Sequence, residues 1–291
     1  MEPLQLIVDA LALGAVYALV ALGFVLVLNG LGAVNLAHGD LVTLGGFLAV
    51  AAASWAPAWP GFVFLPLIAL VMAVIGVLLA GLLPIRRRGA APEDLSLASF
   101  AVGAILAAIL ALDFGTAPVA GPALLATGDI PLLGARVSRQ SLLILGTAIV
   151  LVPAAHLFLN HTQFGRRLRA AGQDPDLAQA LGIETGHMAA ATLALGTMLA
   201  GIAGMLLADK FTVSPVFGLD LLAKSYIAVA IAGWGQVGGA ATIAFLIALF
   251  ETAVSTVAVP AVADGIVYVA LLIFLAFQPQ GLFGPAAQRR A

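Results

Sequence analysis

Long apolar runs, separated by short polar or glycine-rich breaks, dominate the pattern of this chain. A helix that crosses a bilayer needs roughly 20 mostly apolar residues. Windows of this kind fall at residues 6–28, 41–56, 62–83, 95–112, 141–159, 187–208, 222–234, 239–258 and 262–277. The second and seventh windows are short, which favours broken or re-entrant segments there. The pattern predicts an all-α, polytopic integral membrane protein with about 8–9 transmembrane helices.

Composition agrees with a membrane protein. The chain is 63% hydrophobic and 9% charged, with a mean hydropathy of +1.14, whereas soluble domains are about 45–50% apolar and about 25% charged. The net charge of −2 argues against a basic nucleic-acid surface, and the lack of cysteine excludes disulfides and thiolate metal ligands. No linker divides the chain, so we expect residues 1–291 to form a single membrane domain.

The basic residues predict an orientation. With nine crossings, one side of the membrane carries Arg86, Arg87, Arg88, Arg166, Arg167, Arg169, Arg289 and Arg290. The other side carries Arg136, Arg139 and Lys210, together with Lys224 if that residue lies at the interface. Cytoplasmic loops are enriched in lysine and arginine. We therefore expect an external N-terminus and a cytoplasmic C-terminus.

A polar break near residues 29–40 interrupts the first apolar run. Three glycines loosen the helix there, and Asn35, His38 and Asp40 offer hydrogen-bonding groups. Irregular backbone at membrane depth is tolerated where it is buried or lines a cavity. One interpretation places Asn35 and His38 on a translocation path, and the other is a capped loop at the cytoplasmic surface.

Glu251 lies in the middle of the window 239–258. An ionisable group inside a span costs roughly 2.5–3.5 kcal/mol on insertion scales, so it is a functional candidate by default. We predict that it lines the path; the alternative is a structural acid bonded to a hydroxyl such as that of Thr252 or Ser255. Asp220 and Lys224 flank the short seventh window, where both side chains can reach the interface.

A short capped helix is predicted at residues 175–181. Asp174 suits the N-cap, Pro175 the first helical position and Gly182 the C-terminal stop. This helix would present Leu177, Ala178, Leu181 and Ile183. One interpretation is docking into a groove of another protein. The other is an interfacial helix whose neighbours Arg166, Arg167 and Arg169 touch anionic lipid headgroups.

Small side chains line one face of the window 187–208. Thr192, Gly196, Ala200, Gly204 and Ala208 recur at four-residue spacing, which lets a neighbouring backbone approach closely. We interpret Gly196, Ala200 and Gly204 as helix-packing positions inside one subunit, with a dimer interface as the alternative.

The sequence contains no HExxH, GxSxG or P-loop motif, and its four histidines share no metal-ligand spacing, so we predict neither an enzyme nor a metal site.

Three segments of the chain resemble one transporter family. Residues 11–46 contain a glycine–tyrosine segment (Gly14, Tyr17, Ala18, Leu19, Ala21, Leu22, Gly23) and an Asn-x-Ala-His-Gly segment (Asn35, Ala37, His38, Gly39). Residues 165–204 and the tail 279–284 complete the pattern. The chain is similar to the permease subunits of branched-chain amino acid ABC importers (the LivH/LivM family), closer to LivH. It departs from the family in the glycine-rich turn at 232–239 and at Glu93 and Asp94.

The resemblance implies a permease subunit of the bacterial inner membrane that binds no nucleotide or other cofactor itself. Its partners would be a second, LivM-like permease subunit, two ABC ATPases that use ATP, and an extracytoplasmic solute-binding protein. Residues 174–183 would couple to an ATPase, and alternating access would carry leucine, isoleucine or valine. Relatives for urea and short-chain amides keep that substrate class as an alternative. An ion-coupled secondary transporter working through Glu251, Asp40 and His38 is a further one.

Overall fold

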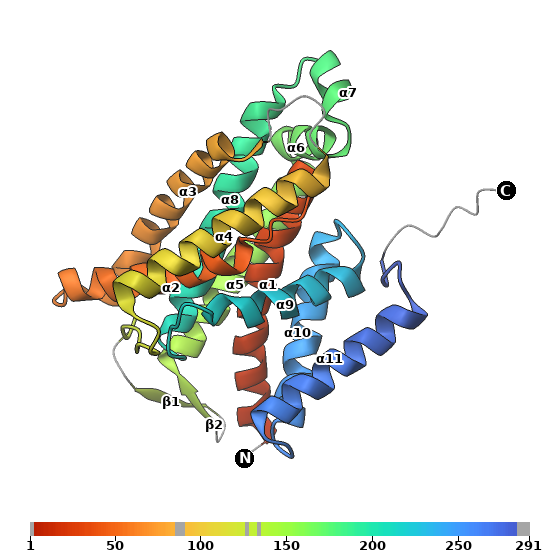
Figure 1. Cartoon of the computed structure of the whole chain (residues 1–291). Helices are drawn as coiled ribbons and strands as arrows, with labels where there is room; N and C mark the ends of the chain where they lie inside the picture. Colours follow the sequence, from red (N-terminus) through yellow and green to blue (C-terminus); the bar gives the residue numbers. More distant parts are fainter. Residues whose placement is uncertain (1–2, 85–90, 126–127, 133–134, 284–291) are drawn as a thin grey trace.

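The computed structural model describes residues 3–84, 91–125, 128–132 and 135–283 (Figure 1). Its elements are α1 (Pro3–Leu31), α2 (His38–Trp55), η1 (Gly61–Val63), α3 (Phe64–Leu82), α4 (Pro92–Phe114), β1 (Asp129–Leu132), β2 (Ala135–Ser138), α5 (Arg139–His161), α6 (Gln163–Gln173), α7 (Pro175–Ala180), α8 (Thr185–Ala208), α9 (Phe217–Ala232), α10 (Val237–Val254) and α11 (Pro260–Phe277).

Helices α1 to α5 and α8 to α11 coincide with the apolar windows of the sequence, which confirms the all-α, polytopic prediction. Among the described residues, 6 helical segments are long and apolar enough to cross a membrane: α1, η1 with α3, α4, α5, α8 and α10. The remaining windows correspond to α2, α9 and α11, which are shorter or less apolar. The sequence did not predict the antiparallel hairpin β1–β2, in which Ile130 pairs with Val137.

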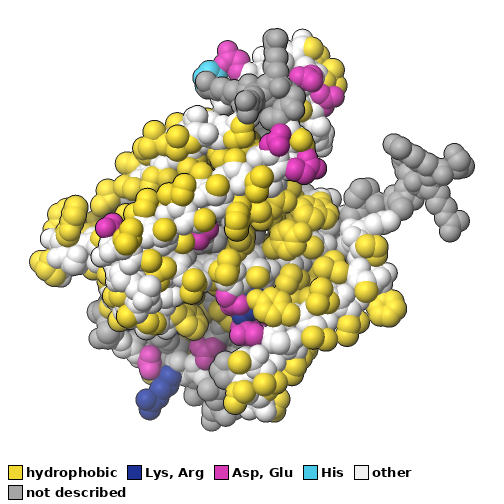
Figure 2. Space-filling view, viewed as in Figure 1, with side chains coloured by type: hydrophobic (Ala, Val, Ile, Leu, Met, Phe, Trp, Pro, Cys, Tyr) yellow, Lys and Arg dark blue, Asp and Glu magenta, His cyan; other side chains and the backbone are white. Residues whose placement is uncertain are grey.

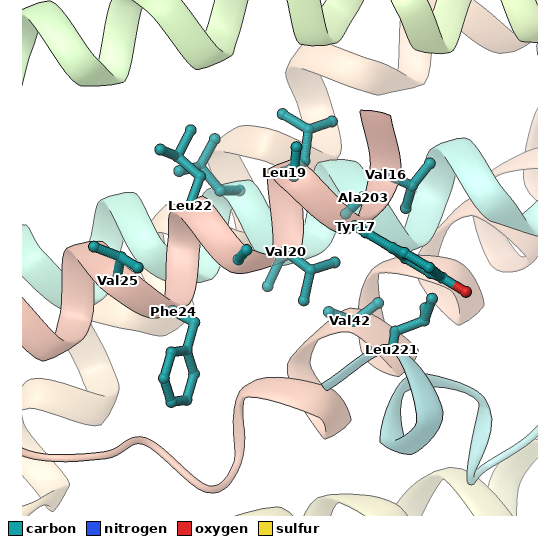
Figure 3. Close-up of a cluster of buried hydrophobic side chains, with 14 of the residues drawn as sticks. Val16, Tyr17, Leu19, Val20, Leu22, Phe24, Val25, Val42, Ala203 and Leu221 are labelled. Carbon is teal, nitrogen blue, oxygen red and sulfur yellow. The ribbon is translucent and has the colours of Figure 1, made fainter. Parts of the chain in front are cut away.

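Helices α1 and α8 occupy the centre of the bundle. The most apolar window of α1 is 83% buried, whereas those of α4 and α5 are 17% buried. A helix that is apolar on all sides belongs in such a core. Figure 3 shows Leu19, Leu22 and Val25 of α1 beside side chains of neighbouring elements, among them Val42 and Ala203, while the hydroxyl of Tyr17 points away from Leu19 and Leu22.

The predicted break between the first two windows is present, and the chain re-enters the bundle there. Helix α1 ends at Leu31, followed by Gly32 in a left-handed conformation at φ +65°. His38 then begins α2 beside Val20, with its Nε2 3.1 Å from the Val20 carbonyl oxygen. The segment 33–37 therefore returns along α1 by about two to three helical turns.

A second break mirrors the first. Helix α8 runs antiparallel to α1, because a Cβ at Gly30 would meet Thr192 while a Cβ at Gly23 would meet the Gly196 carbonyl oxygen. After α8, the chain turns back and begins α9 against the start of α2, where the Gly218 amide donates to the Thr43 hydroxyl over 2.8 Å. The pairs α1–α2 and α8–α9 thus run in opposite directions and meet inside the bundle, an inverted arrangement that the sequence did not reveal.

The two ends of the bundle differ in their elements. Helices α6 and α7 lie at one end, and the hairpin β1–β2 and the N-terminus lie at the other (Figure 1). The last described residues lie near the Leu31 end of α1. There the Leu282 amide donates to Ile231, and Asn29 of α1 donates to the Gly235 carbonyl oxygen.

Candidate functional site

Local sequence signals set the bounds of α7. The Asp174 carboxylate accepts from the Leu177 amide over 2.9 Å, Pro175 occupies the first turn, and Gly182 has φ +79°. A side-chain oxygen at the N-cap satisfies an amide that the helix itself leaves unpaired. The helix spans Pro175–Ala180 with Leu181 at its C-cap, one residue shorter than the expected range.

Helix α7 presents only part of the expected apolar surface. Leu177 and Leu181 are exposed, and Ile183 is half-buried. Ala178 is instead buried, because α7 packs that side against α6 and α8. Of the predicted docking surface, the part that stays accessible is therefore the exposed pair Leu177 and Leu181 at one end of the bundle.

Helix α6 was not predicted, although its signals are present. Thr162 is its N-cap and accepts from the Gly165 amide over 3.0 Å. Leu168 is buried while Arg166 and Arg167 are exposed, which is the pattern of an amphipathic surface helix. The helix that carries these arginines packs against α7.

Asn35 and His38 both lie inside the protein at the break between α1 and α2. The Asn35 side-chain oxygen accepts from the Ala37 amide over 3.2 Å and so stabilises the turn that precedes α2. His38 is fully buried against α1, edge-on to the Phe24 ring, and its Nδ1 has no partner among the described residues. Neither side chain opens onto solvent in this conformation.

Glu251 belongs to a larger polar group. Its Oε1 lies 2.8 Å from the Lys224 ammonium, which is also 2.9 Å from Asp220 Oδ2 and 2.9 Å from Asp264 Oδ1. These residues come from α9, α10 and α11. One ammonium thus joins three carboxyl groups on three helices.

Two tyrosine hydroxyls complete this group. Tyr17 of α1 donates to Glu251 Oε2 over 2.9 Å, and Tyr268 of α11 donates to Asp220 Oδ1 over 2.7 Å. The ammonium also lies 5.6 Å from the centre of the Tyr17 ring, within range of a cation–π interaction. We call this group the Lys224 cluster; it consists of Tyr17, Asp220, Lys224, Glu251, Asp264 and Tyr268.

The Lys224 cluster lies at membrane depth. Tyr17 is the midpoint of α1, 14 residues from Pro3 and 14 from Leu31. At about 1.5 Å per residue it lies roughly 21 Å from either end of that helix. A hydrocarbon core of about 30 Å, centred on α1, would therefore enclose it.

The sequence predicted one member of this cluster and missed its neighbours. The partners of Glu251 are Tyr17 and Lys224 in place of the hydroxyls of Thr252 or Ser255. Interfacial placement of Lys224 is wrong, since this residue is 2% exposed. The four-residue spacings from Asp220 to Lys224 and from Asp264 to Tyr268 were the available signals, because residues so spaced share one helix face.

The small residues of α8 serve close packing within the chain. A Cβ added at Gly204 would overlap the Val42 carbonyl oxygen, and one at Gly196 would overlap the Val27 side chain. Ala200 is fully buried on the same face. Among the described residues, no three histidine or acidic side chains are arranged so that they could hold a metal ion.

Comparisons with known proteins agree on one family. The profile of the family described as "Branched-chain amino acid transport system / permease component" matches residues 6–276. The high-affinity branched-chain amino acid transport system permease protein BraD of Pseudomonas aeruginosa is 25% identical, over 97% of this chain and 95% of its own length. LivH of Escherichia coli K12 is 25% identical over the same shares.

Two further matches cover a slightly smaller share of this chain. A probable branched-chain amino acid transport permease protein LivH of Methanocaldococcus jannaschii is 27% identical, over 91% of this chain and 88% of its own length. Among solved structures, PsaBC from Streptococcus pneumoniae in complex with Fab aligns with a TM-score of 0.49 at 14% identity, covering 95% of this chain and 92% of that chain.

Proposed function

Because the chain belongs to the family of branched-chain amino acid transport system permease components, we propose that it is the transmembrane permease subunit of an ABC importer for leucine, isoleucine and valine. The observation that carries this assignment is the capped helix α7, exposed at one end of an apolar bundle. A permease needs such a contact so that the movement of a separate ATPase is transmitted to its transmembrane helices. The chain itself performs no catalysis and binds no nucleotide.

The proposed assembly contains a second, LivM-like permease subunit, two ABC ATPases and an extracytoplasmic solute-binding protein. Helix α7 docks into a groove of one ATPase, with Leu177 and Leu181 as the apolar anchors. Asp174, Pro175 and Gly182 fix the helix ends, while Ala178 and Ile183 hold it against the rest of the protein.

This docking places the α6–α7 end in the cytoplasm of a bacterial cell with the protein in the inner membrane. The N-terminus then lies outside, and residues 278–283 lie on the cytoplasmic side, near the Leu31 end of α1. The arginines at 166, 167 and 169 fit this orientation. Those at 86–88 and 289–290, on which the sequence argument also rested, lie outside the described residues.

Transport proceeds by alternating access. ATP binding closes the ATPases, and α7 passes that movement to the bundle, whose broken pairs α1–α2 and α8–α9 meet at membrane depth. Discontinuous helices at that depth are typical of transport paths. Three residues are proposed for the path. Glu251 belongs to the partly exposed Lys224 cluster. Asn35 and His38 lie at the turn before α2 and would line the path when the bundle changes between its outward-open and inward-open states.

Uptake by reconstituted vesicles tests the substrate and the energy source. Vesicles would contain this chain with its encoded partners and the binding protein, and labelled leucine would be challenged with excess urea. We expect uptake that needs ATP and is insensitive to urea. Uptake driven by an ion gradient alone would contradict the ABC mechanism, and ATP-dependent uptake of urea would contradict the substrate.

The Leu181→Asp variant tests the coupling role of α7. An exposed leucine can change without unfolding the bundle, so we expect the permease to stay folded in detergent but to lose co-purification with the ATPases. The matched control is Gln163→Asp, which adds the same charge at the exposed start of α6. Normal ATPase association of Leu181→Asp would remove α7 from the coupling interface.

A further inference from the structure

We propose that the Lys224 cluster lines the aqueous translocation path of the assembled importer. This inference rests on the proposed function and adds to it the surface along which solute moves. It extends the path from Glu251 to the residues around it on α9 and α11. The space beyond Asp220 and Asp264 is then filled with water and passing solute.

Exposure of the cluster increases outward from its lysine. The Lys224 side chain is 3% exposed and Glu251 15%, but Asp264 is 38% exposed and Asp220 50%. The ammonium and the Tyr17–Glu251 pair therefore form an inner layer. The two aspartates form an outer layer that faces away from the chain.

Hydrocarbon cannot cover this outer layer at low cost. An aspartate facing lipid at mid-depth costs roughly 2.5–3.5 kcal/mol, and the cluster exposes two of them. Intramembrane charges almost always face the bundle interior or a water-filled cavity. Figure 2 shows acidic side chains gathered around a basic one midway down the visible face, with hydrophobic side chains on both sides.

Helix α3 shows what a lipid-facing surface of this protein looks like. Its outward positions Leu70, Val74 and Leu78 are exposed, and its span contains no charged residue. The surface around Asp220 and Asp264 therefore departs from the composition that lipid requires.

Water fits the cluster better than a dry protein contact. Three carboxyl groups face one ammonium, so a dry partner surface would have to supply further cations to pair the outer aspartates. Water can solvate Asp220 and Asp264 without any further cation. The cluster also lies close to the meeting point of the broken pairs, since Asp220 follows Gly218, which contacts the start of α2.

Thiol labelling tests the proposal directly, because the chain has no cysteine of its own. Ala223→Cys places a thiol three residues after Asp220 on the same face of α9. Ala73→Cys is the matched control, since Ala73 is also half-buried and follows the exposed Leu70 by three residues on α3. The assembled complex in vesicles would be treated with a charged, water-soluble methanethiosulfonate.

We expect Ala223→Cys to react at least about tenfold faster than Ala73→Cys, because the thiolate attacks the methanethiosulfonate and displaces methanesulfinate, and thiolates form in water and not in hydrocarbon. Equal rates, or no reaction at Ala223→Cys, would overturn the proposal. If that variant fails to assemble, Gly265→Cys beside Asp264 replaces it, with Gly146→Cys on α5 as control. A Cβ at either glycine meets nothing within 4 Å, so neither change disturbs packing.

The labelling result is independent of substrate identity. Fast labelling of Ala223→Cys without leucine uptake would keep the path and overturn the proposed substrate. Leucine uptake with no difference in labelling would keep the proposed function and overturn this inference.

Discussion

Helices α3 and α11 both lie on the outside of the bundle, yet they differ in what they expose. The outward face of α3 is aliphatic throughout, whereas α11 carries Asp264 and Tyr268 and joins α9 and α10 through Lys224. Both helices are strongly apolar, α3 as part of a candidate membrane span and α11 as a shorter apolar helix. Hydropathy therefore locates a helix in the membrane without saying whether its outer face meets lipid or water.

Among the substitutions that test this difference, removal of Lys224 should have the largest effect on stability. Lys224→Met leaves three carboxyl groups at membrane depth without their shared cation, and breaking a buried ion pair in this way costs about 3–5 kcal/mol. We expect a lower free energy of unfolding and poor accumulation, measured by thermal unfolding in detergent and by membrane yield.

Lys210→Met is the control for that experiment. Lys210 lies 4.0 Å from Asp9 with both side chains partly exposed, so its loss should cost less than about 1 kcal/mol. Equal effects of the two substitutions would mean that the Lys224 cluster contributes no more than a surface ion pair.

A charge placed on α3 should be nearly as damaging. Val74 is 51% exposed on the aliphatic outward face of α3, and Val74→Asp should raise the free energy of membrane insertion by about 2.5–3.5 kcal/mol. An insertion assay with Val74→Leu as control measures this. Normal insertion and assembly of Val74→Asp would show that α3, like α9 and α11, faces water or protein.

Loss of one hydroxyl in the inner layer should have a smaller effect. Tyr17→Phe removes the hydrogen bond to the Glu251 carboxyl group, and such bonds to charged groups contribute about 1.5–3 kcal/mol. Tyr226→Phe is the control, because Tyr226 is 37% exposed and its contacts with Phe24 and Trp234 are made by the ring, which phenylalanine keeps. Matching melting temperatures for the two variants would argue against a structural role for the Tyr17 hydroxyl.

The smallest expected effect contrasts an open position on the outside of the bundle with a crowded one in the core. Gly146→Ala on α5 meets nothing within 4 Å, so the better helix propensity of alanine should stabilise the protein by about 0.5–1 kcal/mol. Gly204→Ala on α8 should have the opposite sign, since its Cβ would overlap the Val42 carbonyl oxygen. The melting temperatures of the two variants, measured by thermal unfolding, test this prediction. Stabilisation by both substitutions would mean that α2 and α8 can move apart without loss of stability.

The bounds of α7 could be predicted from a short stretch of sequence, unlike the partners of Glu251 in the Lys224 cluster. Asp174, Pro175 and Gly182 act on the backbone within a few residues, so the helix they bound was predicted to within one residue of its end. The burial of Ala178 could not be predicted, because it depends on α6 and α8 packing against α7. Helix α6 was missed for a different reason: its polar face resembles a loop when read by hydropathy alone.

By itself, the sequence determined the membrane class, the positions of the apolar helices and the break after Leu31, because hydropathy and glycine act locally along the chain. Only the tertiary structure decided that α9 returns to the start of α2 and that Tyr17 meets Glu251, 234 residues away. Contacts between distant helices depend on which faces pack together. A single charged residue in an apolar run gives no information about the helix from which its partner will come.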